Sequence, residues 1–371
     1  MAPPPRAPAD SDPARQLIVE EVVHAAVAAG LPAPQRDPRL DRLADDIART
    51  TPEDRQPSLE LVAFLLGHYG IVEPEPNLLF VRGGPHAEKA IADLIRPQVP
   101  AILRQQPHSR VGVGIHRDKE LAVVLAMQEQ HIELRPVPRA LAPGLVAELE
   151  GRLLDGFRNP RVIITGPGGV TSEVSVREGK GRFRAALGCR RDRAGVYQVE
   201  IVGDGDRGPA VLANFPVYCV EPPPRRSPPV VMETGAPQDP EQAENELVAL
   251  VNRERESRGL SPLRVDRRLV EVARAHSAEM AATSVVAHLS PRTGNVADRV
   301  KRAGLLPHLV AENVGRAYSA LQAHRGFMGS PGHRANVVEP RVTALGIGVA
   351  AGHPENGTVP LFVTELFTEG L

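Results

Sequence analysis

The chain has 371 residues and a mass of 39.9 kDa, which at roughly 100–200 residues per domain allows two or three domains. Lysine and arginine number 44 against 45 aspartate and glutamate, so the net charge of −1 gives no general attraction to nucleic acid or to an anionic membrane. Aromatic residues make up only 3% and tryptophan is absent, which disfavours a surface that stacks single-stranded bases. No apolar run approaches the roughly 20 residues that a membrane-spanning helix needs. We therefore expect no nucleic-acid partner and no transmembrane segment.

The chain begins with a proline-rich segment. Because of its prolines, we expect residues 1–13 to be a flexible leader. This segment also has no apolar core of the kind found in a signal peptide. Either the protein is cytosolic or an export signal is absent from this sequence. Apolar residues then recur at close to helical spacing from Leu17 to Ala26, which predicts a helix at the start of a first folded domain, residues 14–140.

Residues 141–221 carry a different pattern. Short β-branched runs alternate with glycine and proline, which predicts a small antiparallel β sandwich. The predicted strands are 161–165, 172–176, 181–187, 196–202 and 210–219. The two cysteines of the chain, Cys189 and Cys219, lie at or near the ends of these strands. They either form one disulfide or remain free core thiols.

A proline-rich linker follows this module. Consecutive prolines at residues 222–224 and 228–229 favour an extended chain and cannot continue a helix or a sheet. We therefore place a linker at 222–240 and the last domain at 241–371.

The first and last domains share a pattern of spaced residues, which indicates an internal repeat. The glycine-bearing stretches 111–115 and 345–349 match position by position. The alternative is an unrelated helical domain, because generic helix-turn and strand patterns also produce such matches. Nearer the start of each domain, four pairs match at one constant separation along the chain: Gly30 and Gly259, Asp37 and Asp266, Leu40 and Leu269, Ala44 and Ala273.

Apolar periodicity in the last domain predicts four helices and then two paired strands. Asp266 is a good N-cap for the second helix, on which His276 is expected to be a packed core residue. The predicted helices are 242–257, the one that follows Asp266, 296–303 and 319–328, and the predicted strands are 344–350 and 359–367.

Two histidines and a glutamate of this domain lie outside the predicted helices. His288, Glu312 and His333 carry the nitrogen and oxygen donors that Zn²⁺ accepts, with water as a fourth ligand. They lie far apart along the chain, unlike a two-histidine motif on one turn of a helix. Judged by spacing alone, these three residues are better explained as unrelated side chains at the surface or hydrogen-bonded in the core than as one metal site.

Several short motifs follow one another in order between about Asn245 and Phe367. In these motifs the last domain resembles the CAP superfamily (cysteine-rich secretory proteins, antigen 5 and pathogenesis-related 1 proteins), and most of all its bacterial, SCP-like branch. The motifs are Leu250-Val251-Asn252-Arg253-Glu254-Arg255, His288-Leu289-Ser290-Pro291, Asp298-Arg299-Val300, Ala311-Glu312-Asn313-Val314, Ser330-Pro331-Gly332-His333-Arg334-Ala335-Asn336, Gly346-Ile347-Gly348-Val349 and Val363-Thr364-Glu365-Leu366-Phe367.

The resemblance implies an α-β-α sandwich around a small antiparallel sheet, with a cleft that holds two histidines and two glutamates and, in several members, a divalent ion such as zinc. It makes His288 the first histidine, Glu312 the first glutamate and His333 the second histidine. The second glutamate falls near Ser330, where this chain has no carboxylate, so one potential ligand is missing. Phe327 stands where a tryptophan is usual. The other interpretation is a hydrogen-bond network that braces the loops around the cleft.

The repeat carries a prediction for the first domain. When the two glycine-bearing stretches are aligned, the three site positions fall on Asp54, Leu78 and Val99. This copy would lack both imidazoles. We expect a degenerate CAP-like α+β domain with an emptied site, serving as a scaffold or a partner surface.

The resemblance implies an exported protein, extracellular, periplasmic or in the cell envelope, that binds a lipid, glycan or protein ligand at the cleft without catalysis. A peptidase-like hydrolase, in which zinc or a His–Glu pair activates water, is a second class. A purely structural interaction protein is a third. Ser290 and Ser330 lie near the histidines, but neither sits in a Gly-x-Ser-x-Gly elbow or in an evident Ser/His/Asp set.

Overall fold

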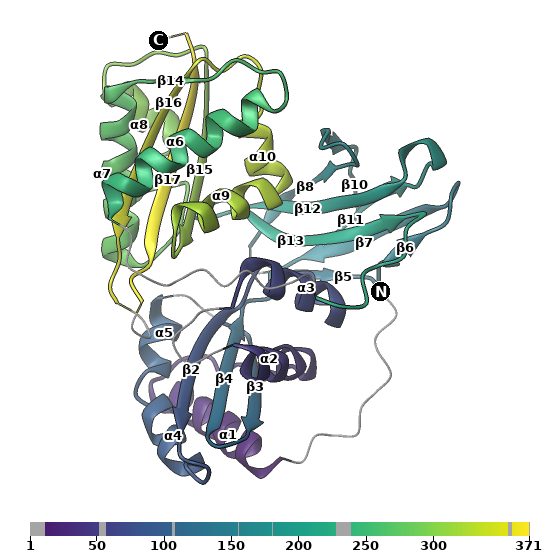
Figure 1. The fold of residues 1–371 in the computed structure, drawn as a ribbon, viewed down its shortest axis with the longest axis vertical. Helices are drawn as coiled ribbons and strands as arrows, with labels where there is room; N and C mark the ends of the chain where they lie inside the picture. The colour runs from purple at the N-terminus through teal and green to yellow at the C-terminus, as the bar shows by residue number, and fades with distance from the viewer. Residues whose placement is uncertain are drawn as a thin grey trace. The chain divides into compact units, whose positions relative to one another are not determined.

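The structure, a computed structural model, describes residues 12–51, 57–105, 108–154, 156–179, 181–227, 239–354 and 358–370 (Figure 1). It divides the chain into two compact units. The first unit comprises residues 1–155, 177–196 and 212–234, and the second comprises 156–176, 197–211 and 235–371. The segment 141–221 therefore contributes strands to both units, and the predicted domain boundaries stay a prediction. None of the described helices is long and apolar enough to cross a bilayer.

The first unit contains a four-stranded sheet with helices on both faces. The strand order is β1-β3-β4-β2, with β1 parallel to β3 and the other neighbours antiparallel. The strands are β1 Gln35–Arg36, β2 Asn77–Gly83, β3 Arg110–Arg117 and β4 Leu121–Gln128, and the helices are α1 Pro13–Ala28, α2 Pro38–Thr50, α3 Leu59–Tyr69, α4 Glu88–Ile95 and α5 Val99–Gln105.

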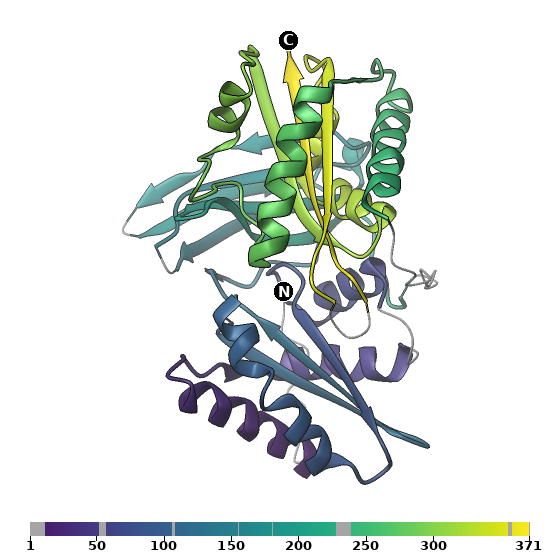
Figure 2. The same cartoon turned by 90° about the vertical axis from the view of Figure 1, so that its left-hand side faces the viewer.

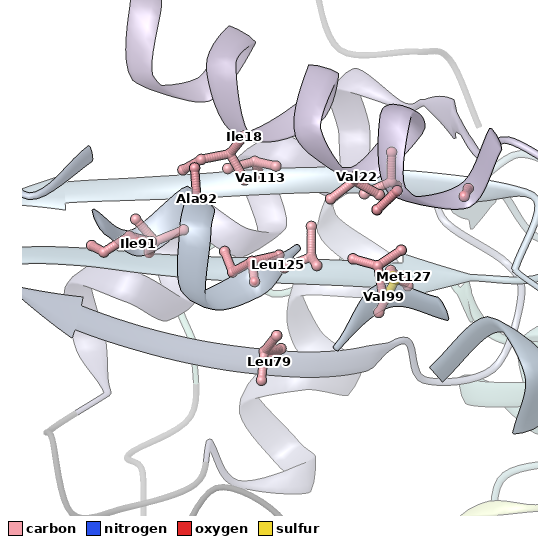
Figure 3. Close-up of a cluster of buried hydrophobic side chains, with 14 of the residues drawn as sticks. Ile18, Val22, Leu79, Ile91, Ala92, Val99, Val113, Leu125 and Met127 are labelled. Atoms are coloured by element: carbon pink, nitrogen blue, oxygen red, sulfur yellow. The ribbon is translucent and has the colours of Figure 1, made fainter. Parts of the chain in front are cut away.

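Alternation along the strands of this sheet sends side chains to two cores. Val113 and Leu125 face α1, α4 and α5, where Ile18 and Ile91 complete a buried cluster (Figure 3). Val124 faces α2 and α3 on the other side. The helix predicted at 17–26 is thus confirmed as α1. It begins at Pro13, with Asp12 as its N-cap, so Pro13 does not belong to a leader.

The first unit also carries further strands and the disulfide. β10, β11, β7 and β5 form an antiparallel sheet in that order, and β6 pairs in parallel with β13. Cys189 and Cys219 are joined with an Sγ–Sγ distance of 2.07 Å. The bounds are β5 Ile132–Leu134, β6 Ala140–Leu141, β7 Val146–Leu153, β10 Arg177–Gly179, β11 Arg182–Gly188 and β13 Gly208–Cys219, with a 3₁₀ turn at Arg191–Arg193. Residues 208–211 of β13 belong to the second unit.

The second unit is built around another four-stranded sheet. Its order is β14-β16-β17-β15, with β14 parallel to β16 and the other neighbours antiparallel. Its strands are β14 Arg264–Val265, β15 Leu309–Ala317, β16 Ala344–Ala351 and β17 Leu361–Glu369, and its helices are α6 Pro240–Glu256, α7 Arg267–Thr283, α8 Val296–Arg302, α9 Ala320–Gly329 and α10 Pro331–Val337.

Helices cover both faces of this second sheet. Leu345, Ile347 and Val349 of β16 pack in a core shared with α6, α9 and α10. The alternate residue Ala344 faces α7 and α8. Figure 2 shows α7, in green, lying along the yellow strands β16 and β17. The result is the α-β-α layering that the resemblance implied for the last domain.

Three further strands complete the second unit. β8 Arg158–Thr165 pairs antiparallel with β9 Thr171–Val174 and with β12 Gly195–Gly205. Strands therefore occur at all five positions predicted between residues 161 and 219. The predicted linker falls partly on residues 228–238, which lie outside the described residues.

Paired glycines let one strand of each sheet approach a helix closely. A Cβ atom on Gly348 would lie 2.1 Å from the backbone nitrogen of Arg274 in α7, and one on Gly346 would lie 2.3 Å from the Cβ of Leu269. The first unit repeats this arrangement, since Gly112 lies against Leu40 and Gly114 against Ala44 of α2. Only glycine fits at such positions without moving the strand.

We predict that Gly348→Ala destabilises the protein by about 2–4 kcal/mol, because the new methyl group overlaps the α7 backbone and forces β16 away from the helix. Gly326→Ala is the matched control, since Gly326 is exposed within α9 and has nothing within 4 Å of a built Cβ. Its change should be neutral or stabilising by about 0.5–1 kcal/mol. Urea unfolding measures both, and equal effects of the two substitutions would contradict this account.

Candidate functional site

The three predicted site residues come from three different elements of the second unit. His288 lies in the segment that follows α7, Glu312 lies on β15 and His333 lies in α10. The sequence predicted regular structure at neither of the last two places. β15 escaped prediction because Glu312 and its neighbour Asn313 interrupt its apolar pattern, although both are buried. α10 has only seven residues and begins at Ser330-Pro331, where Ser330 is the N-cap and proline opens the first turn.

Glu312 joins His288 to Arg299. Its Oε2 lies 2.9 Å from Nδ1 of His288, and its Oε1 accepts a hydrogen bond from Arg299. The Glu312 side chain is only 2% exposed, so the guanidinium compensates a carboxylate that water hardly reaches. Arg299 also donates to the carbonyl oxygens of His288 and Gly294, which ties the 288–294 loop to the same ion pair.

His333 sits opposite His288 as a neutral imidazole. The ring centroids of the two histidines are 6.4 Å apart, and Phe327 packs edge-on against His333 at 5.2 Å. Burial lowers the pKa of His333 to about 3, with the neighbouring His288 as a smaller cause in the same direction. Phe327, which stands where the family usually has a tryptophan, thus places an aromatic ring against the second histidine.

A buried polar network holds α10 against the sheet behind His333. The Asn313 amide donates to the carbonyl oxygen of His333 and to Oε2 of Glu365 on β17. Asn336, one turn along α10, donates to Oδ1 of Asn313 and to the carbonyl oxygen of Glu312. Glu365 is fully buried, and burial raises its pKa to about 7. The network fixes the backbone of both Glu312 and His333.

The two serines near the histidines are engaged elsewhere. Ser290 Oγ donates to the carboxylate of Glu279 and accepts from the backbone amides of Arg292 and Thr293. Ser330 Oγ donates to Glu200 of β12. Neither hydroxyl is directed at an imidazole as a nucleophile would be. His276 is the packed core residue that the sequence predicted, with Nε2 2.9 Å from the carbonyl oxygen of Ala287.

The geometry suits a cation bound by His288 and His333 better than a cation bound by these two histidines and Glu312 together. Among the described residues, no group of three His, Cys, Asp or Glu side chains is arranged to hold a metal. Both oxygens of Glu312 are occupied, which suits a carboxylate that orients His288 through Nδ1 and leaves Nε2 for a metal. Two imidazoles on a tetrahedral zinc ion have ring centroids about 5 Å apart, so the rings must approach by roughly 1 Å.

The sequence predicted His288, Glu312 and His333 as site residues; the structure places Glu312 against His288 and the His333 ring 6.4 Å from the His288 ring. Arg299 and Glu365 were not predicted as site residues from the sequence. Both lie within the short motifs, but nothing in the motifs indicates which residues they bond. Glu200 was not predicted either, because it lies far from Ser330 in the chain and outside every motif. Of the residues that the predicted repeat pairs with the three predicted site residues, Leu78 lies on β2 and Val99 opens α5, while Asp54 lies outside the described residues.

Comparisons with known proteins agree with the fold of the second unit. Residues 248–367 match the cysteine-rich secretory protein family, CAP. The chain carries a CAP domain. It spans about half of one curated relative and about a third of another. YkwD of Bacillus subtilis, an uncharacterized protein, is 32% identical over 127 residues, 34% of this chain and 48% of YkwD. YlbC of the same organism, an uncharacterized membrane protein, is 31% identical over 108 residues, 29% of this chain and 31% of YlbC.

Solved structures of CAP-domain proteins are more distant from this chain. An extracellular protein containing a SCP domain from Bacillus anthracis is 18% identical, with 65% of this chain and 86% of that chain covered and a TM-score of 0.32. A cysteine-rich secretory protein from Staphylococcus aureus is 11% identical, with 73% and 91% covered and a TM-score of 0.28. The assignment of the CAP domain rests on the family match and on YkwD.

Glu365 gives the CAP domain a measurable pH dependence. Its pKa is about 7 in the folded state against about 4.5 when unfolded, so its contribution to stability is full below pH 4.5 and is lost as the pH rises through 7. We predict that Glu365→Gln removes this loss, of the order of 3 kcal/mol, while keeping an acceptor for Asn313. The measurement is denaturant unfolding at pH 5 and pH 8.

The exposed Glu271 of α7 provides the control for this experiment. Glu271→Gln should follow the wild-type pH dependence, and Glu365→Gln should gain stability relative to wild type only at the higher pH. Parallel curves for wild type and Glu365→Gln would show that burial does not shift this carboxyl group.

Proposed function

We propose that the CAP domain is a non-catalytic ligand-binding domain of an exported protein, and that His288 and His333 hold its ligand through a divalent cation such as zinc. The observation that carries the proposal is the bond between the buried Glu312 and Nδ1 of His288. It selects the tautomer whose Nε2 is available, opposite a second imidazole that stays neutral at physiological pH.

The donor set favours binding over catalysis. Two imidazoles leave coordination positions for oxygen atoms of a lipid, glycan or protein ligand. A hydrolase would also need a base near the attacking water, but the Glu312 carboxylate is shared between His288 and a guanidinium. Export is supported by the Cys189–Cys219 disulfide, because such bonds persist in oxidising compartments.

We infer further that the first unit is a second copy of the CAP framework without a site. Both four-stranded sheets have the same order and the same sense of pairing. In the second sheet Glu312 is opposite Leu366, which is opposite Gly346. In the first sheet the same register steps lead from Gly112 to Leu78. The position of the site carboxylate is therefore filled by leucine.

A charge-reversed ion pair also supports the copy. Arg15 of α1 pairs with Asp45 of α2 at 3.0 Å. At the positions that the repeat pairs with these two, Glu244 of α6 forms an ion pair with Arg274 of α7. In each case the carboxylate accepts a hydrogen bond from a strand amide, that of Ile115 in the first unit and that of Val349 in the second. Both units thus have an ion pair between their first two helices, but the positive and negative residues lie on opposite helices. A copy with this framework and no histidines suits a scaffold or a partner surface.

We predict that zinc raises the thermal unfolding midpoint of the wild-type chain. Zinc at about 100 times its dissociation constant stabilises a folded state by about 2.7 kcal/mol, or about 5–10 °C in a unit of this size. His288→Ala and His333→Ala should each abolish the rise, while His353→Ala, at an exposed position away from the site, should retain it. An identical wild-type midpoint with and without zinc would remove the metal from the proposal.

A further inference from the structure

A carboxylate from outside the CAP domain occupies the position next to its second histidine. Glu200 of β12 is fully buried, and its Oε1 accepts a hydrogen bond from the Gly332 amide at 2.9 Å. Its other oxygen accepts a hydrogen bond from Ser330, near which the resemblance to the CAP superfamily places a second glutamate. The carboxylate that the sequence lacks at Ser330 is thus supplied from another part of the chain.

The turn that follows β12 makes a second contact, on the loop of the first histidine. The Leu289 amide donates to the carbonyl oxygen of Arg207 at 3.1 Å. The next residue, Gly208, has φ of +94°, and a Cβ built on it would lie 3.3 Å from the Cβ of His288. The backbone of this turn therefore lies directly against His288 and Leu289.

β8 and the β8–β9 turn make the third contact, on α10. A Cβ on Gly332 would lie 2.8 Å from Oε1 of Glu200 and 3.6 Å from Cδ1 of Ile163 on β8. A Cβ on Gly169, in the turn, would lie 2.5 Å from a guanidinium nitrogen of Arg334. Glycine on either side of the contact lets the two surfaces approach closely.

All three contacts fall on residues beside the site histidines, and the segment 197–208 makes the first two of them. We propose that the segment 197–208 forms a built-in cover on the His288–His333 site, held closed by the bonds from Ser330 and Gly332 to Glu200. The inference rests on the proposed function, because the covered site is the one assigned to the ligand. The His288 side chain keeps 26% of its surface exposed, so an ion can enter while the cover is closed. A lipid, glycan or peptide requires the cover to move, which makes Glu200 a determinant of the size of ligand admitted.

Carbethoxylation of histidines by diethyl pyrocarbonate tests the cover in the full chain without any metal or ligand. The reagent attacks neutral imidazole, and His333 is neutral at pH 7, so slow modification of His333 reports on access. We expect His333 to react far more slowly than the exposed His353 in the wild type. In Glu200→Gln, loss of the charge-assisted bonds should raise the His333 rate about tenfold. Glu173→Gln, at an exposed position on β9, is the control and should leave the rate unchanged.

Hydrogen exchange in the wild type provides a second measurement that requires no variant. The amide of Gly332 lies in the first turn of α10 and has no partner within the helix, and the amide of Leu289 lies in a loop. Both should be protected if the cover is closed. Fast exchange at both amides, or wild-type modification of His333 at the rate of His353, would overturn the proposal. A protected site that fails to bind zinc would instead count against the proposed function alone.

Discussion

The arrangement of the CAP site depends on one buried carboxylate, that of Glu312, which binds both an imidazole and a guanidinium. Glu312 binds Nδ1 of His288 with one oxygen and the guanidinium of Arg299 with the other. A carboxylate this deeply buried is tolerated only with such partners. The same arginine holds the carbonyl oxygen of His288, so the ion pair fixes both the imidazole and the loop that carries it. His333 is positioned separately, through the asparagine network around Glu365.

The sequence predicted a large part of this structure, for identifiable physical reasons. Helical periodicity and the Asp266 N-cap located α7 closely, and the glycine pattern of 345–349 located β16. The three site residues were identified because the motif resemblance named them; their spacing alone did not. β15 was missed because buried polar residues interrupt its apolar alternation. Glu200 was out of reach, since its contact with Ser330 depends on the tertiary packing of β12, which no local pattern records.

The two four-stranded sheets share several features, and we propose that they are copies of one framework. Strand order, the glycine approach to the second helix and an ion pair between the first two helices occur in both units. In the first unit the arginine lies on the first helix, and in the second unit the carboxylate does. The two sheets differ at one register position: Leu78 of β2 packs in an apolar cluster, whereas β15 carries Glu312.

We propose that His288 and His333 bind one cation while Glu312 orients His288. Anomalous diffraction at the zinc edge, from crystals of the full chain soaked in zinc, tests it most directly. We expect a single peak about 2 Å from Nε2 of His288 and from a ring nitrogen of His333, with Glu312 still bonded to Nδ1 of His288. A peak on another set of side chains, or no peak at either histidine, would contradict it.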